Sequence, residues 1–282
     1  MKKMFTIVLA ALMVAALFAG CGSSTAETKA PETTAAPAAT AAAETATPAE
    51  TEAAAPAFTT IEAGKLIMST NAAFPPYEMV ADDGSFEGID VEIAGAIAKK
   101  LGLELVVDDM DFDAALLAVQ QGKSDIVMAG VTVNEDRKLV MNFSDTYSKG
   151  VQVVIVKEGS DVTLDNLGDQ MIGTQRGTTG YIYTSGDYGE DHVTAYDTGA
   201  TAVMALVNGQ VGAVVIDSAP AEEFVKANPG LKILDTEFTN EDYAIGMAKG
   251  NTALLEAING ALAELTADGT LQSIVDKYIP AE

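Results

Sequence analysis

The sequence predicts an α/β fold built from two similar units with largely parallel sheets. The first observation behind this prediction is that, from Phe58 onward, β-branched runs alternate with stretches whose apolar residues recur at helical spacing. Chains in which strands and helices alternate in this way typically form parallel sheets covered by helices. The second observation is a weak internal repeat, which divides the same region into two comparable parts.

The first 20 residues have the features of an export signal. Lys2 and Lys3 precede an apolar run from Phe5 to Phe18 that is too short to span a bilayer comfortably. Cys21, the one cysteine of the chain, follows small residues and is the predicted lipidation site, so the mature protein is expected to begin there. An uncleaved membrane anchor is the alternative interpretation of this segment.

Residues 22–57 are predicted to be a disordered tether. They consist mainly of Ala, Thr, Glu and Pro and contain no aromatic or large aliphatic side chain. Burial of apolar surface therefore cannot offset the entropy lost on ordering, and the prolines exclude a continuous helix. The folded part is expected outside the cytoplasm, attached to the membrane through the lipid on Cys21.

The elements beyond the tether follow from local patterns. Asp90 is the predicted N-cap of a helix that buries Ile93 and Ile97 and stops at Gly102. Two helices are predicted to close the chain, with apolar stripes at Leu254, Ile258, Leu262 and Leu265 and at Leu271, Ile274, Val275 and Tyr278. The predicted strands are Leu66–Ser69, Glu104–Val107, Ile126–Met128, Val151–Val156, Met171–Thr174, Val193–Tyr196, Ala213–Ile216, Leu231–Leu234 and Tyr243–Ala248.

The internal repeat aligns Ala115–Ala129 with Ala202–Ile216. Each copy has the pattern of a helix, a glycine turn and a buried strand, although chance similarity between two ordinary αβ units explains so few identities equally well. The alignment makes Gly130 and Asp217 equivalent positions, each just beyond the carboxyl end of a strand. Open α/β sheets bind ligands at that edge, so a ligand between the two units is expected.

Composition excludes several classes of function. With 41 acidic against 16 basic residues, the formal charge of −25 argues against binding to nucleic acid or to anionic lipid head groups. One histidine, His192, and no cysteine besides Cys21 argue against a transition-metal site, a Ser-His-Asp triad and disulfides, and no cofactor is expected. Gly122-Lys123-Ser124 lacks the first glycine of a phosphate loop, so an ATPase would be a separate subunit.

Arg137 is a candidate anion-binding residue. Asn134 is a plausible cap for a short helix that follows Gly130, and a capping box of Thr132 with Glu135 is an alternative. Either choice places Arg137 in the first helical turn, near backbone amides. A guanidinium and free amides together suit a carboxylate, whereas the alternative is a surface arginine paired with a neighbouring acid.

Asp217 is the matching candidate for a cationic group. It ends an apolar strand and would bind an ammonium, or it would simply cap the next helix. An anion site and a cation site that face each other would recognise both ends of a free amino acid. Further candidates lie near strand ends or begin a helix. They are Asn71, Phe74, Phe112, Gln175 and the loop Gly177-Thr178-Thr179-Gly180. The alternative interpretation for each is a purely structural role in the core or in a turn.

The chain resembles the family 3 extracytoplasmic solute-binding proteins, which serve ABC transporters for polar amino acids. The resemblance covers roughly Ile61 to Tyr278 and is specific because several motifs occur in order. They are Asn71-Ala72-Ala73-Phe74-Pro75-Pro76-Tyr77-Glu78, Gly88-Ile89-Asp90-Val91-Glu92, the Gly130–Arg137 segment, Phe143-Ser144-Asp145, Gly177-Thr178-Thr179-Gly180 and Ala267-Asp268-Gly269-Thr270. It implies a two-lobed, periplasmic-binding-protein-like (type II) fold whose ligand lies in a cleft between the lobes.

The resemblance also implies roles for the candidate residues. Arg137 would hold the ligand α-carboxylate, helped by Thr132, Thr179 and the backbone at Gly130. Asp217 would hold the α-ammonium, while Phe74 and Phe112 enclose the ligand side chain. Asn71, Gln175 and Thr178 complete the predicted site.

The same resemblance implies a monomer that delivers its amino acid to a permease by hinged closure. Lobe 1 is predicted at 58–148 and 243–282 and lobe 2 at 149–242, with chain crossings near 147–151 and 240–243. The identity of the amino acid stays open: Asn71 and Gln175 suggest a polar neutral or cationic ligand, whereas Arg176 would admit an acidic ligand if it faced the cleft. Two other functions are compatible with the fold, a dehydratase acting on cyclic carboxylic acids and a ligand sensor for a membrane kinase.

Overall fold

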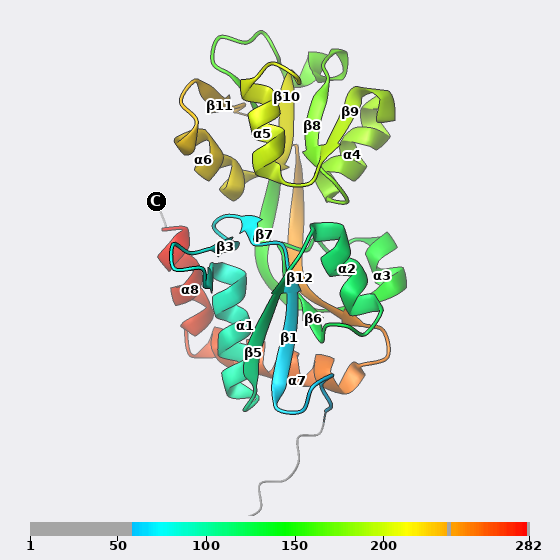
Figure 1. Cartoon of the computed structure of the whole chain (residues 1–282), viewed down its shortest axis with the longest axis vertical. Helices are drawn as coiled ribbons and strands as arrows, with labels where there is room; N and C mark the ends of the chain where they lie inside the picture. Colours follow the sequence, from blue (N-terminus) through cyan, green and yellow to red (C-terminus); the bar gives the residue numbers. More distant parts are fainter. Residues whose placement is uncertain (1–57, 236–237, 281–282) are drawn as a thin grey trace, which may run out of the picture. The chain divides into compact units, whose positions relative to one another are not determined.

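The structure is a computed structural model that describes residues 58–235 and 238–280 (Figure 1). The predicted signal at 1–20, the lipidation site Cys21 and the predicted tether at 22–57 lie outside the described residues. The strands are β1 (Lys65–Thr70), β2 (Ala73–Phe74), β3 (Glu78–Val80), β4 (Phe86–Glu87), β5 (Glu104–Asp109), β6 (Ile126–Val127), β7 (Met141–Lys157), β8 (Ile172–Gln175), β9 (Val193–Tyr196), β10 (Ala213–Asp217), β11 (Leu231–Ile233) and β12 (Thr239–Ala248).

The helices are mostly short and alternate with the strands. They are α1 (Ile89–Lys100), α2 (Phe112–Gln120), α3 (Glu135–Val140), α4 (Thr179–Tyr188), α5 (Gly199–Val207), α6 (Ser218–Ala227), α7 (Thr252–Ala267) and α8 (Thr270–Tyr278), with 3-10 turns η1 (Leu164–Asp169) and η2 (Glu190–His192). Within the described residues, no helix combines the length and the apolar character that crossing a membrane requires.

A mixed nine-stranded sheet organises the fold, in the order β5-β1-β6-β12-β7-β10-β8-β9 with β11 paired to β7. The predicted α/β class is confirmed, and the outer pairs β1–β5, β1–β6, β10–β8 and β8–β9 are parallel as expected. The centre differs from the prediction, because β7 and β12 run antiparallel to each other and to their neighbours. A small antiparallel sheet, β2-β3-β4, was not predicted, since its strands are only two or three residues long.

Strands β7 and β12 connect two groups of elements. We call β1–β6 with α1–α3, α7 and α8 lobe 1, and β8–β11 with α4–α6 lobe 2. Figure 1 shows β7 and β12 side by side between the lobes, and their pairing extends from Met141 opposite Ala248 to Gln152 opposite Thr239. The predicted crossings near 147–151 and 240–243 lie in these strands and pair with each other. The predicted residue limits of the lobes stay predictions.

The start of α1 corrects one prediction. Its N-cap is Gly88, whose φ of 125° is accessible to glycine, and not Asp90. Asp90 lies in the first turn, fully buried, and its carboxylate accepts hydrogen bonds from the Gly130 amide at 2.9 Å and the Tyr147 hydroxyl at 2.8 Å. The tertiary structure therefore uses this acid to join α1 to the loop after β6 and to β7.

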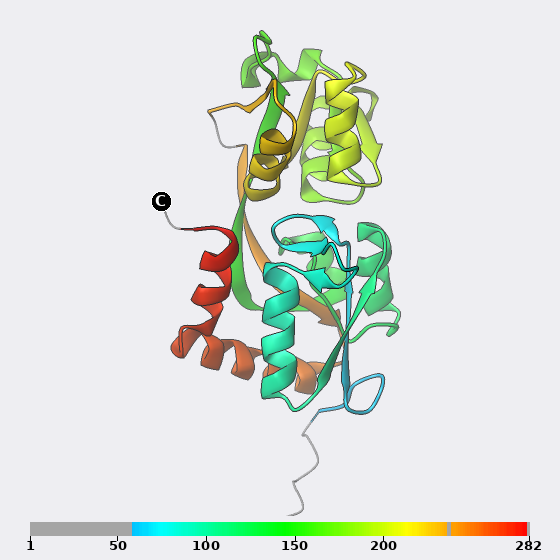
Figure 2. The same cartoon turned by 60° about the vertical axis from the view of Figure 1, so that its left-hand side comes forward.

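Most of the remaining predicted elements agree with the structure, but β7 (Met141–Lys157) is much longer than the predicted strand Val151–Val156, and β12 begins at Thr239 and not at Tyr243. Leu254, Ile258, Leu262 and Leu265 are buried on α7, and Figure 2 shows α7 and α8 packed beside α1 on one side of lobe 1. The two copies of the repeat are α2 with β6 and α5 with β10, each with a positive-φ glycine after its helix. Their equivalent residues Gly130 and Asp217 line the same pocket.

Candidate functional site

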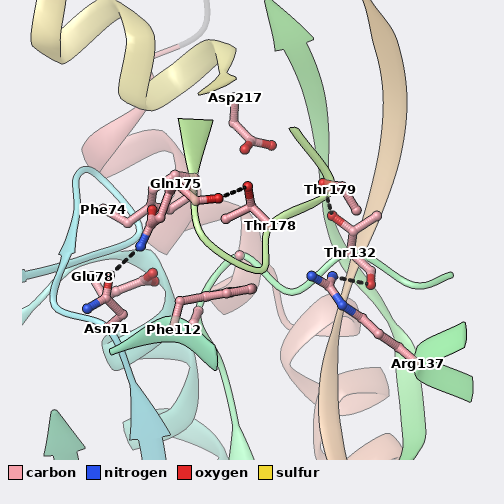
Figure 3. A pocket seen from close by; sticks show the side chains of 12 residues that line it. Asn71, Phe74, Glu78, Phe112, Thr132, Arg137, Gln175, Thr178, Thr179 and Asp217 are labelled. Atoms are coloured by element: carbon pink, nitrogen blue, oxygen red, sulfur yellow. Dashed lines mark hydrogen bonds between the residues drawn. The ribbon is translucent and has the colours of Figure 1, made fainter. Parts of the chain in front are cut away.

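A pocket lies where side chains from lobe 1 and lobe 2 converge (Figure 3). All ten residues predicted for the ligand site line it, together with Glu78 and Ala129, which were not predicted. The predicted residues are Asn71, Phe74, Phe112, Gly130, Thr132, Arg137, Gln175, Thr178, Thr179 and Asp217. Residues that are far apart in the sequence thus form one surface, which is the arrangement that a cleft between lobes requires.

Arg137 is brought to the pocket by the short helix α3. Asn134 caps this helix by accepting a hydrogen bond from the Arg137 amide at 2.8 Å, as predicted, and Arg137 as a whole residue is 7% exposed. Its Nη1 donates to the Thr132 carbonyl at 2.8 Å, and its Nη2 donates across the lobes to the Gly177 carbonyl at 3.2 Å. Because a guanidinium has five N–H donors, others remain to bind a carboxylate.

Two neighbours shape the environment of Arg137. Its Cζ atom lies 5.4 Å from the centre of the Phe112 ring, a distance at which a cation is attracted to the aromatic face. Burial lowers the pKa of Arg137, while the charges of Glu241 and Asp217 oppose that shift, so the guanidinium stays protonated. The alternative of a surface arginine does not fit this geometry.

The N-terminus of α4 faces the same pocket. Thr178 is its N-cap and accepts a hydrogen bond from the Tyr181 amide at 3.3 Å, while its own hydroxyl donates to the Gln175 carbonyl at 2.8 Å. The Thr179 hydroxyl lies 3.4 Å from that of Thr132, which joins lobe 2 to lobe 1. Amides in the first turn of a helix have no partner within the helix and attract anions.

Asp217 lies at the opposite side of the pocket, at the end of β10. It occupies the N-cap position of α6, but its side chain makes no capping hydrogen bond; the Tyr243 hydroxyl donates to it instead. Burial, followed by the neighbouring carboxyl of Glu241, raises the pKa of Asp217 well above its usual value. A cationic group placed beside this carboxyl would favour its ionised form, lower its pKa and be held strongly.

Gly130 differs from its predicted role. Its φ is +54°, and a Cβ atom at this position would lie 2.8 Å from a carbon of the Phe74 ring, so glycine allows the aromatic wall to approach. Its amide, expected to help hold a carboxylate, already donates to Asp90. The carbonyl oxygen, an acceptor suited to an ammonium, is what Gly130 can offer a ligand.

Asn71 and Gln175 close the pocket between the lobes. The Gln175 Nε2 atom donates to the Asn71 Oδ1 atom at 2.9 Å and to the Asp197 carbonyl at 3.2 Å. The Asn71 Nδ2 atom donates to the Met110 carbonyl at 2.9 Å. Both N–H groups of Gln175 are therefore used, whereas Asn71 uses its Oδ1 atom and only one of its two N–H groups.

Glu78 is the principal residue that sequence reasoning missed. It is fully buried on β3, and within the described residues neither of its carboxyl oxygens has a hydrogen-bond partner. Burial, then the nearby carboxyls of Asp90 and Asp217, raise its pKa well above the usual value. The available signal was an acid inside the otherwise apolar run Phe74–Val80, where an unpaired charge is costly unless it serves a ligand.

Arg176, whose direction the sequence left open, does not line the pocket. Its side chain is 52% exposed and pairs with Asp197 on the surface at 3.4 Å. A second basic group for an acidic ligand is therefore missing from the lining, in which Arg137 is the one basic residue.

The pocket is nearly closed. Its volume is about 10 Å³, roughly the space that one water molecule needs. Direct contacts between the lobes, Asn71 with Gln175 and Arg137 with Gly177, border it. An amino acid is larger than this volume, so we expect these contacts to separate when a ligand enters the pocket.

Comparisons with known proteins agree with this geometry. Residues 66–281 match the profile of the bacterial extracellular solute-binding proteins, family 3. ABC transporter arginine-binding protein 1 of Escherichia coli K12 is 30% identical over 79% of this chain and 94% of its own length. The L-cystine-binding protein TcyJ of the same strain is 31% identical over 78% of this chain and 85% of its own length.

A solved structure supports the same relationship. The arginine-, lysine-, histidine-binding protein ArtJ of Geobacillus stearothermophilus superimposes with a TM-score of 0.74 at 32% identity, covering 77% of this chain and 96% of its own. Both curated relatives are also named as binding proteins, not as enzymes or kinases. The matched profile, the relatives and the shared two-lobed fold together establish that this chain belongs to the bacterial extracellular solute-binding proteins, family 3.

Proposed function

We propose that this protein captures an amino acid with a positively charged side chain, L-arginine foremost, and delivers it to an ABC importer permease served by a separate ATPase subunit. Family membership makes it an extracytoplasmic binding protein for a polar amino acid and not an enzyme. The observation that carries the finer assignment is Glu78, a buried carboxyl without hydrogen-bond partners in the pocket that also contains Arg137 and Asp217.

The two ends common to all amino acids have matching groups. The free N–H donors of Arg137 and the first-turn amides of α4 suit the α-carboxylate. The Asp217 carboxyl and the Gly130 carbonyl oxygen suit the α-ammonium. Charge-assisted hydrogen bonds contribute about 1.5 to 3 kcal/mol each, so a few of them account for most of a micromolar affinity.

The rest of the lining selects the ligand side chain. Glu78 contributes a carboxyl, and Gln175 has both of its N–H groups engaged, so its side chain can offer a ligand only its oxygen. A buried carboxyl at this end of the pocket favours a side chain that carries hydrogen-bond donors and a positive charge, and it repels a carboxylate. Phe74 and Phe112 border the pocket as apolar walls along which the methylene groups of such a side chain can pack.

The arrangement at the membrane is part of the proposal. Cleavage of the export signal and acylation of Cys21 would tether the folded part outside the cell membrane as a monomer, through residues 22–57. Ligand would bridge the lobes and shift an open form to the closed form that the permease recognises.

A thermal-shift screen of the twenty amino acids with L-cystine and L-ornithine tests the ligand class. A ligand at 100 times its dissociation constant stabilises the protein by about 2.7 kcal/mol, so the preferred ligand produces the largest rise in melting temperature. We expect L-arginine to lead, other cationic amino acids to follow, and L-glutamate to have no effect. A shift with neutral or acidic amino acids alone would contradict the cationic assignment.

Substitutions at the two charged ends test the assignment of the site. Arg137→Ala and Asp217→Ala should each weaken L-arginine binding by about a hundredfold or more, because each leaves a ligand charge without its buried partner. Calorimetry measures the affinity, and unfolding curves establish that each variant folds. Arg176→Ala and Asp197→Ala, on the exposed surface pair, are matched controls that should keep wild-type affinity. Unchanged affinity in either pocket variant would refute the site.

A further inference from the structure

Two carboxyl pairs are buried at the pocket. The first pair is Glu78 of β3 and Asp90 of α1, both fully buried. Asp90 Oδ2 accepts hydrogen bonds from the Gly130 amide and the Tyr147 hydroxyl, but Asp90 Oδ1 and both oxygens of Glu78 have no partner among the described residues. If both groups were ionised, two anions would lie side by side in a fully buried site, which is very costly.

The second pair is Asp217 of β10 and Glu241 of β12. Asp217 accepts a hydrogen bond from Tyr243. Glu241 is 6% exposed, and its Oε2 accepts from the Thr132 hydroxyl at 3.0 Å and from Gln152 Nε2 at 2.9 Å, whereas its Oε1 has no partner among the described residues. The negative charge of Glu241 raises the pKa of Asp217, so the two carboxyls are close neighbours.

The buried charges do not balance. In the described part of the chain, Arg137 is the only buried basic side chain, and of these four carboxyl groups its charge interacts with those of Glu241 and Asp217. A buried charge without a partner costs several kcal/mol, and a carboxyl avoids that cost by keeping a proton. A cationic amino acid brings two positive groups, one for each pair, and would remove the need for those protons.

We propose that this site exchanges protons for its ligand: Glu78 with Asp90 and Asp217 with Glu241 each hold a proton in the free protein, and each pair releases it when a cationic group of the ligand takes its place. The inference rests on the proposed function, because it assigns the α-ammonium to the second pair and the cationic side chain to the first. The proton is thereby a competing ligand at both ends of the pocket.

The direction of the pKa values agrees with this geometry. Burial raises the pKa of Asp90 to about 6, although the Gly130 amide and the Tyr147 hydroxyl oppose the shift. Burial and neighbouring carboxyls raise the pKa of Glu78 and of Asp217 further above the usual value. The titratable and charged groups that face the pairs from surrounding elements are Tyr77, Asp109, Arg137, Tyr147, Tyr183 and Tyr243.

Calorimetry measures the exchange directly. Titration of the purified protein with L-arginine at one pH, in buffers of different ionisation enthalpy, gives the number of protons released as the slope of observed heat against buffer enthalpy. We expect release of protons. We also expect the dissociation constant of L-arginine to rise as the pH falls, by up to tenfold per pH unit for each proton, because protons occupy the carboxyls that the ligand needs.

L-citrulline separates the two ends of the pocket. It has the shape of L-arginine and the same α-ammonium, but its side chain is neutral, so it should displace the proton of the Asp217 pair alone. We therefore expect fewer protons to be released by L-citrulline than by L-arginine. Equal release by the two ligands would overturn the assignment of a proton to Glu78 and Asp90.

Glu78→Gln provides the matched variant. Glutamine has the shape of a protonated glutamate, so we expect the variant to fold with nearly unchanged stability and to release the same number of protons with either ligand. The proton exchange would be overturned if L-arginine bound the wild-type protein with a heat that does not depend on the buffer and an affinity that does not depend on pH. That result would leave the proposed function intact. Failure of every amino acid tested to bind would overturn both.

Discussion

At the scale of single residues, Tyr243 joins the pocket to the strands that connect the lobes. It is fully buried on β12, and its hydroxyl donates to Asp217. Its ring packs edge to face with that of Tyr77, with the two ring centres 5.3 Å apart. Gly150 on the paired strand β7 leaves the room that this ring occupies, because a Cβ atom there would lie 2.4 Å from the Tyr243 hydroxyl oxygen. The orientation of the proposed ammonium site thus depends on a glycine outside the pocket.

Gly150→Ala tests that dependence. The added methyl group should displace the Tyr243 ring, lower the free energy of unfolding by about 1 to 3 kcal/mol and weaken L-arginine binding about tenfold. Denaturant unfolding and calorimetry measure the two effects. Gly186→Ala on α4 is the control, because nothing lies within 4 Å of its added Cβ, and alanine favours the helix. Wild-type affinity in Gly150→Ala would show that Tyr243 does not orient Asp217.

Single residues also show how much of the site could be predicted from the sequence. Arg137 and Asp217 could be identified because each follows a recognisable strand or cap and matches a family motif. Glu78 lies in the family motif Asn71–Glu78, but the sequence assigns it no role, because its burial depends on the packing of β3 against groups distant in the sequence. Asp90 was predicted as a cap because acids are common at helix starts, whereas the tertiary structure gives it partners on two other elements.

At the scale of elements, α4 begins at the pocket and offers its first-turn amides there. Thr178 orients this end of the helix by bonding to both the Tyr181 amide and the Gln175 carbonyl. The dipole of the helix adds partial positive charge at the same place, which favours a bound carboxylate. The loop Gly177–Gly180 is therefore more than a turn between β8 and α4.

Thr178→Ala should affect both stability and binding. Loss of the N-cap costs about 1 kcal/mol, and the freed first turn should hold the ligand carboxylate less well, lowering affinity severalfold. Thr198→Ala is the matched control, because Thr198 caps α5 by accepting from the Thr201 amide at 3.1 Å and does not line the pocket. It should lose similar stability in thermal unfolding and keep its affinity in calorimetry. Equal affinity losses in the two variants would argue against a role for the α4 terminus.

At the scale of the whole folded part, β7 and β12 are the strands that continue from one lobe into the other. Residues near Gly150 and Asn240 pair along this connection, and register shifts interrupt the pairing between Tyr243 and Gly246. Outside the connection, the polar contacts between the lobes are few and cluster at the pocket, as between Thr132 and Thr179. A ligand that bridges the lobes can therefore replace or reinforce them.

Small-angle scattering tests hinged closure. Saturation with L-arginine should reduce the radius of gyration of the folded part, because the open form is expected to be more extended than the closed form. Asp217→Ala, which should not bind tightly, is the control and should show no reduction at the same ligand concentration. An unchanged radius of gyration in the saturated wild-type protein would contradict closure on ligand binding.

The sequence by itself determined the α/β class, most helices and strands, the repeat that makes Gly130 and Asp217 equivalent, and ten of the twelve residues that line the pocket, because these depend on local periodicity and on motifs. Only the tertiary structure decided how the lobes connect, since the antiparallel pairing of β7 with β12 joins segments about a hundred residues apart. It also decided that Glu78, Asp90 and Glu241 are buried beside the pocket. The acid inside the apolar run Phe74–Val80 is a local signal for Glu78, but the burial and charge balance of the whole cluster are properties of packing.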